Sequence, residues 1–150
     1  MLRCVANLAL FAFAGCSTLR LDLPREFLVT ESSTTELKAT TADDAIFWGQ
    51  THPLQGDAGL DFWIEALKHD LVDNRGYTLL REDPVMTNSA GTRIAMQTFE
   101  SSFEGRLYRY LVAVAMRSGP SVLVARLTAE HDTFEKHADA IRHALSNSRW

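Results

Sequence analysis

The chain has 150 residues, of which 46% are hydrophobic and 23% are charged, as in an ordinary globular domain. Its 19 acidic residues outnumber 15 Lys and Arg, and the formal net charge of −4 argues against general nucleic-acid binding. Cys4 and Cys16 are the 2 cysteines, so neither a disulfide framework nor a cysteine-ligated metal cluster is expected.

Residues 1–15 have the layout of a secretory signal peptide. Arg3 supplies a positive start, residues 4–14 form an apolar run broken only by Asn7, and Ala14 and Gly15 are small. The apolar run is too short to span a bilayer. A buried N-terminal helix or strand is the alternative, but the order of charge, apolar run and small residues favours a signal peptide.

The segment Phe13-Ala14-Gly15-Cys16 resembles the lipobox of bacterial lipoproteins, with Phe13 where Leu is usual. The resemblance implies that Cys16 becomes the first residue of the mature chain and carries a diacylglyceryl group and an N-acyl chain, which anchor the protein in membrane lipid. Ser17 implies the outer membrane, facing the periplasm, if the host is Gram-negative. Without Arg3 the mature chain has 14 basic and 19 acidic residues, a net charge of 14 − 19 = −5. Residues 16–26 are predicted to be the lipidated Cys and a short tether.

A single globular domain is predicted over residues 27–150. It begins with strands at residues 27–29 and 45–48, a weakly periodic stretch at 36–41, and a loop at 49–59. The first long helix follows, and helical spacing gives it an apolar stripe of Leu60, Trp63, Ile64, Leu67 and Leu71. Asp57 is the expected N-cap, and Gly76 is the expected residue just beyond the C-terminus.

From residue 77 onward the hydrophobic period changes to two, which predicts strands at residues 77–87 (broken at 81–84), 92–100, 107–116 and 122–127. Residues 111–116 are apolar at every position, as in a central strand covered on both faces. A last helix has the stripe Phe134, Ala138, Ile141 and Leu145, and Asp132 with Glu135 has the spacing of a capping box.

Two strands, a helix, four strands and a helix predict an α+β fold, in which one antiparallel sheet carries a helix on each face. This order resembles the PsbP-like fold, which includes bacterial DcrB-type lipoproteins. The resemblance covers about residues 27–147 and rests on the element order, the Trp63 helix followed by Gly76-Tyr77, and Gly-Arg-Leu-Tyr at 105–108. It implies a mostly non-catalytic family.

Residues capable of chemistry are scattered, and neither a metal site nor a cofactor is expected. His131 and His137 are six residues apart and point away from each other on a helix, while Glu135, Asp139 and His143 form an ordinary solvated stripe. His52 and His69 lie elsewhere. Arginines on or beside strands (Arg93, Arg106, Arg109, Arg117 and Arg126) are interpreted as capping strand ends, with an anion site as the less favoured alternative.

The sequence thus favours a membrane-anchored envelope lipoprotein that is a binding or assembly module for an envelope protein partner, and not an enzyme. The expected binding residues are His52, Pro53, Leu54 and Phe62, the apolar groups with the greatest expected exposure. A metal-assisted hydrolase of the envelope, using His and carboxylate residues, is the alternative.

Overall fold

The computed structural model describes residues 18–54 and 56–148, so the predicted signal peptide (residues 1–15) and Cys16 lie outside the described residues. The described elements are β1 (Leu28–Ser32), β2 (Glu36–Thr40), β3 (Ile46–Pro53), α1 (Leu60–His69), the π-helical turn η1 (Asp70–Asn74), β4 (Thr78–Glu82), β5 (Met86–Thr87), β6 (Arg93–Phe103), β7 (Arg106–Met116), β8 (Ser121–Glu130) and α2 (His131–Asn147).

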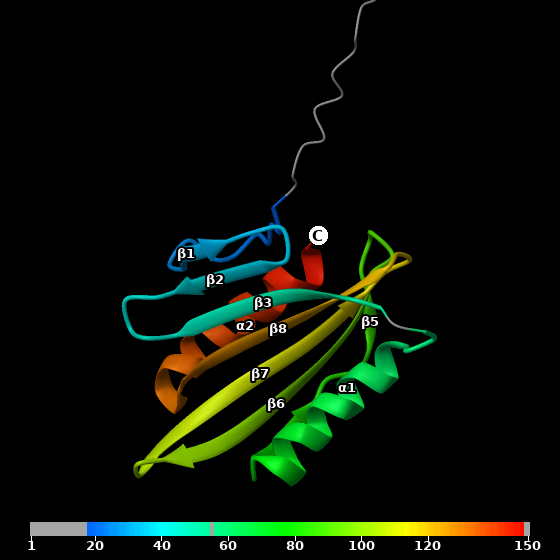
Figure 1. Cartoon of the computed structure of the whole chain (residues 1–150). Helices are drawn as coiled ribbons and strands as arrows, with labels where there is room; N and C mark the ends of the chain where they lie inside the picture. The colour runs from blue at the N-terminus through cyan, green and yellow to red at the C-terminus, as the bar shows by residue number, and fades with distance from the viewer. Residues whose placement is uncertain (1–17, 55, 149–150) are drawn as a thin grey trace, which may run out of the picture.

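The strands of the described residues form one 8-stranded antiparallel sheet in the order β1-β2-β3-β8-β7-β6-β4, with β5 paired to β6. The long strands β6, β7 and β8 occupy the middle and are joined by tight turns. The two helices lie on opposite faces (Figure 1). The predicted α+β fold, with a helix on each face, is confirmed.

The larger core lies between the sheet and α2. Phe134, Ala138, Ile141 and Leu145 of α2 are buried as predicted and pack on inward residues of the sheet such as Phe47. The alternate residues of β7 belong to the other face, where Val114 packs with Leu60 and Ile64 of α1. This explains why residues 111–116 are apolar throughout, since the strand is covered on both sides.

The start of the described chain packs on the α2 face instead of hanging free as a tether. Leu19 is only 6% exposed, and its N–H donates to the carbonyl of Ser33 at 2.8 Å. Leu21 and Leu23 pack against the same core. Leu21 packs against Gly49: a Cβ atom added at residue 49 would lie 3.4 Å from Cδ1 of Leu21. Of the predicted tether, the part from Leu19 onward therefore belongs to the folded domain.

Of the two ends predicted for the first helix, the C-terminal end is confirmed and the N-cap is not. Gly76 has φ +70, and the N–H groups of Gly76 and Tyr77 donate to the carbonyls of Val72 and Leu71 at 3.1 and 2.9 Å, which confirms the predicted helix end. Asp57 is not the N-cap of α1, because Gly59 holds that position in an extended conformation without a side-chain bond.

The predicted capping box of α2 is also wrong. The helix follows β8 without a loop and starts at His131, so Glu130 and not Asp132 holds the N-cap position. Glu135 instead contacts Arg109 of β7. The short strand β2 adds to the predicted order, since Glu36–Thr40 is a strand that buries Leu37 and Ala39. The strand predicted at 77–87 forms two strands, β4 and β5, on either side of its break.

Asp43, in the loop between β2 and β3, ties that loop to α2. Its carboxylate accepts hydrogen bonds from the Thr41 hydroxyl at 2.6 Å, His137 Nε2 at 2.9 Å and Lys136 Nζ at 3.1 Å. The Thr41 hydroxyl, followed by His137 and Lys136, holds the pKa of the Asp43 carboxyl well below its usual range. A carboxylate with this environment stabilises the folded chain only while it is ionised.

We expect Asp43→Asn to reduce stability at neutral pH and to make stability less sensitive to acid. Because the pKa of Asp43 is depressed on folding, its contribution is complete above the unfolded value of about 4 and falls as the pH drops further. Urea midpoints of both proteins at several pH values between about 7 and 2.5 should therefore converge toward the acid end. Asp44→Asn is the matched control, because Asp44 has φ 66, a conformation that Asn tolerates. A constant difference between Asp43→Asn and the parent chain at every pH would contradict the assignment.

Candidate functional site

An apolar groove lies where the end of β3 meets the start of α1. It has a volume of about 450 Å³ and is lined by His52, Pro53, Ala58, Phe62 and Trp63. Three of these, His52, Pro53 and Phe62, are residues that the sequence singles out as binding residues. The structure therefore brings most of the predicted set together, although their role in binding stays a prediction.

Phe62 and Trp63 are adjacent in α1, but they point in different directions and differ in burial. Ile64 is buried against the sheet, whereas Phe62 lies about 200° around the helix from it and is 63% exposed. Trp63 lies between these directions and is half-buried, beside the core cluster that contains Leu60. Phe62 and Trp63 thus form one wall of the groove while Leu60 and Ile64 hold the helix to the sheet.

His52 and Pro53, at the end of β3, complete the lining of the groove. The His52 ring stacks on Trp63 with centroids 5.8 Å apart and an interplanar angle of 26°. The indole Nε1 of Trp63 is buried and has no hydrogen-bond partner among the described residues. The groove therefore offers flat apolar surfaces and one imidazole, which suit contact with an apolar side chain.

Leu54 does not line the groove, contrary to the predicted set. It packs beside the core under α1, and its N–H donates to the Pro120 carbonyl at 2.7 Å. Trp63 and Ala58 are the groove residues that sequence reasoning missed. The helical stripe assigns Trp63 to the core, and Ala58 carries no signal of its own.

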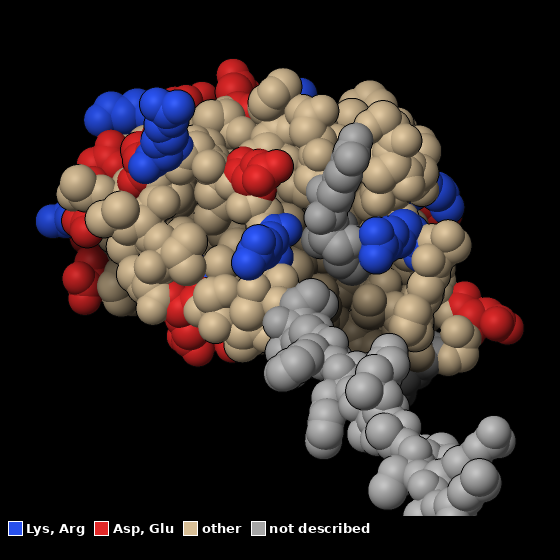
Figure 2. All heavy atoms as spheres, turned by 90° about the horizontal axis from the view of Figure 1, so that it is seen from above, with Lys and Arg blue, Asp and Glu red and all other residues tan. Residues whose placement is uncertain are grey.

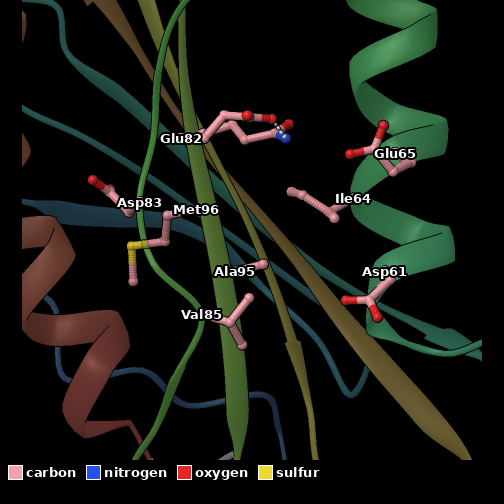
Figure 3. A pocket seen from close by; sticks show the side chains of 9 residues that line it. Asp61, Ile64, Glu65, Glu82, Asp83, Val85, Ala95 and Met96 are labelled. Carbon is pink, nitrogen blue, oxygen red and sulfur yellow. Dashed lines mark hydrogen bonds between the residues drawn. The ribbon is translucent and has the colours of Figure 1, made fainter.

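A second cavity, of about 270 Å³, lies between α1 and the β4–β6 edge and contains Asp61, Glu65, Glu82 and Asp83 (Figure 3). Three of these carboxylates, Glu65, Glu82 and Asp83, are already partnered. Glu82 accepts from Gln97 at 2.8 Å, and Lys68 pairs with both Glu65 and Glu82. Asp83 points away from α1 and pairs with Arg142 of α2 at 3.2 Å. Glu65, Glu82 and Asp83 are therefore already engaged in ion pairs within the fold.

The five histidines lie apart, each with a different neighbour. His69 contacts Asp73, His131 lies 2.9 Å from Asp132, and His137 binds Asp43, while His143 contacts Asn147 and His52 stacks on Trp63. Across residues 18–54 and 56–148, no three His, Cys, Asp or Glu side chains are grouped so that they could hold a metal ion.

The strand arginines follow the sequence interpretation only in part. Arg106 pairs with Glu130 at 2.6 Å, and Arg109 pairs with Glu100 at 3.3 Å, near the ends of their strands. Arg126 differs, because it lies half-buried over the Trp48 ring. On the face seen in Figure 2, Lys and Arg are interspersed with Asp and Glu, so charges of one sign do not gather there.

No family model and no curated protein sequence matches this chain. Solved structures do match, and they share its α+β fold. A Pseudomonas aeruginosa protein of unknown function, PA94, described as a candidate regulator, is 18% identical with a TM-score of 0.59, over 89% of this chain and 96% of the other. LpqN of Mycobacterium tuberculosis, involved in cell envelope biogenesis, is 17% identical with a TM-score of 0.56, over 85% and 80%.

A protein from Bacteroides thetaiotaomicron is 13% identical with a TM-score of 0.50, and the match covers 87% of this chain and 44% of that protein. At these identities the likeness shows the fold alone. A helix both long and apolar enough to cross a membrane is absent from the described part of the chain.

Proposed function

We propose that this chain is a lipid-anchored envelope protein that binds a protein partner through the groove of His52, Pro53, Ala58, Phe62 and Trp63, without catalysis. Acylated Cys16 holds it in the membrane, on the periplasmic side of the outer membrane in a Gram-negative host. The observation that carries the proposal is the exposed Phe62 beside the half-buried Trp63, on a helix fixed to the sheet by Leu60 and Ile64.

The chemistry of the groove supports binding. Its single titratable side chain, His52, is stacked on Trp63, and its lining contains neither a carboxylate nor a nucleophilic hydroxyl. Acid–base or nucleophilic catalysis needs such groups within hydrogen-bond reach of one another. Aromatic side chains on a rigid element are typical anchors of protein interfaces. The involvement of LpqN in envelope biogenesis is consistent with a role in the same compartment.

Photo-crosslinking tests the groove directly. We expect p-benzoylphenylalanine in place of Phe62 to give one defined adduct with a membrane-fraction protein in cells, because this side chain projects from the groove wall. The same probe in place of Phe103 is the matched control, since Phe62 and Phe103 are both 63% exposed. Trp63→Ala in the Phe62 probe chain should weaken the adduct. Equal adducts from both positions would contradict the proposal.

A histidine exchange distinguishes this function from the metal-assisted hydrolase. We expect His69→Gln, His131→Gln and His143→Gln together to complement a deletion strain, because these residues lie outside the groove. His137 is left intact, since it is buried and bonded to Asp43. Loss of complementation in a variant that still folds would favour the hydrolase.

A further inference from the structure

A third cavity lies on the α1 face of the sheet, at the opposite end of the helix from the groove. Its volume is about 150 Å³, and its polar and aromatic lining consists of Trp48, Arg75, Tyr77, Tyr110, Arg126 and Thr128. Strand register places four of these groups side by side, because Arg126 pairs with Trp48 on one side and with Val112 on the other, and Thr128 pairs with Tyr110. The cavity is thus built on three neighbouring strands.

Arg126 supplies the cavity with a cation that has no carboxylate within ion-pair distance among the described residues. Its guanidinium lies 5.4 Å from the centre of the Trp48 ring, and Lys38 Nζ lies at the same distance from that ring. Lys38 is neutralised by Glu31 and Glu36. Burial lowers the pKa of Arg126 and the positive charge of Arg75 lowers it further, while the charges of Asp70 and Tyr77 act in the opposite direction. A half-buried guanidinium without a paired carboxylate is stabilised by an anion bound beside it.

The other cation at the cavity is already satisfied. Arg75 Nε pairs with Asp70 at 2.8 Å, so the two groups together carry no net charge. The helix end nearby is satisfied as well, because the carbonyls of Asp70, Leu71 and Val72 accept hydrogen bonds from the N–H groups that follow. One unpaired positive charge therefore remains, which matches a monoanion better than a phosphate dianion.

The walls of the cavity are aromatic. Tyr77 and Tyr110 lie with ring centroids 4.6 Å apart at 39°. Burial and the neighbouring Tyr77 raise the pKa of Tyr110 to about 12, so its phenol is neutral at physiological pH and adds no negative charge. The π-helical turn η1 contributes Leu71 and widens the helix just before Tyr77, a distortion frequent at functional sites.

We infer that this cavity binds a small aromatic carboxylate, with the carboxylate on Arg126 and the ring between the tyrosines and Trp48. Arginine pairs with carboxylates through two parallel hydrogen bonds, and aromatic walls accept a flat ring. A cavity of about 150 Å³ is large enough for one benzene ring. This site is separate from the proposed protein-binding groove and does not depend on it.

Titration calorimetry of the purified full chain with sodium benzoate tests the inference. We expect a dissociation constant of about 1 mM, with acetate, benzyl alcohol and inorganic phosphate each at least about tenfold weaker. Arg126→Gln should weaken benzoate at least about tenfold, since it removes the paired charge. Arg93→Gln, which removes an exposed arginine of the same sheet, should leave the affinity unchanged.

Ile46→Trp provides a second variant if Arg126→Gln does not fold. Ile46 lines the cavity and is 54% exposed, so a larger side chain there should obstruct the cavity without disturbing the core. We expect it to weaken benzoate binding by about tenfold or more. Benzoate binding no tighter than acetate, benzyl alcohol or phosphate would overturn the inference, as would unchanged affinity in either variant.

Discussion

Phe47→Ala is expected to lower the free energy of unfolding by about 3–5 kcal/mol. Phe47 lies in β3 between Ala39 of β2 and Leu127 of β8, is 0% exposed, and belongs to the core beneath α2. Its removal leaves a cavity that the surrounding strands cannot close, because the backbone on both sides is fixed by sheet hydrogen bonds. Urea unfolding followed by far-UV circular dichroism measures the loss.

Phe103→Ala is the matched control for this prediction. Phe103 is at the end of β6 and is 63% exposed, so its truncation should change the free energy of unfolding by no more than about 0.5 kcal/mol. The difference between the two phenylalanines measures burial, since the chemical change is the same. Similar effects at the two positions would mean that Phe47 does not lie in the core.

Cys16→Ser is expected to shift the protein from the membrane fraction to the soluble envelope fraction, or to leave it unprocessed. Three acyl chains hold a protein to a bilayer essentially permanently, because two such signals already suffice for stable anchoring. Fractionation and metabolic labelling with a lipid precursor measure the effect. Cys4→Ser is the control, since Cys4 lies inside the predicted signal peptide and should not alter processing. A parent chain that takes up no lipid label would rule the anchor out.

Much of the fold could be predicted because its strongest elements have regular hydrophobic periods. The stripes of α1 and α2 and the doubly apolar β7 together define a sheet covered on both faces. Strand β2 could not be predicted in this way, because Glu36–Thr40 has only two buried apolar residues within five positions. The start of α2 could not be predicted correctly either, because the helix follows β8 directly and there is no loop in which Asp132 could act as its N-cap.

The candidate sites could be predicted only where neighbours in sequence are neighbours in space. His52 and Pro53 are adjacent at the end of β3, and Phe62 follows shortly after in α1. The predicted loop at 49–59 is wrong over residues 49–53, which belong to β3, but the expected exposure of these three groove residues could still be inferred locally. The cavity around Arg126 depends instead on strand register. Trp48 comes beside Arg126 only because β3 pairs with β8, an arrangement that crosses most of the chain and leaves no local signal.

Because Leu19 packs on the domain, a lipid anchor at Cys16 would limit how far the folded domain could move from the membrane. Only Ser17 and Thr18 separate an acylated Cys16 from this buried residue, a reach of about 10 Å when extended. The folded body would then be confined to a thin layer next to the lipid headgroups and would diffuse in two dimensions. Partners in the same membrane would meet it at a high effective concentration, so weak groove contacts would be sufficient for association. Soluble targets would gain nothing from this confinement.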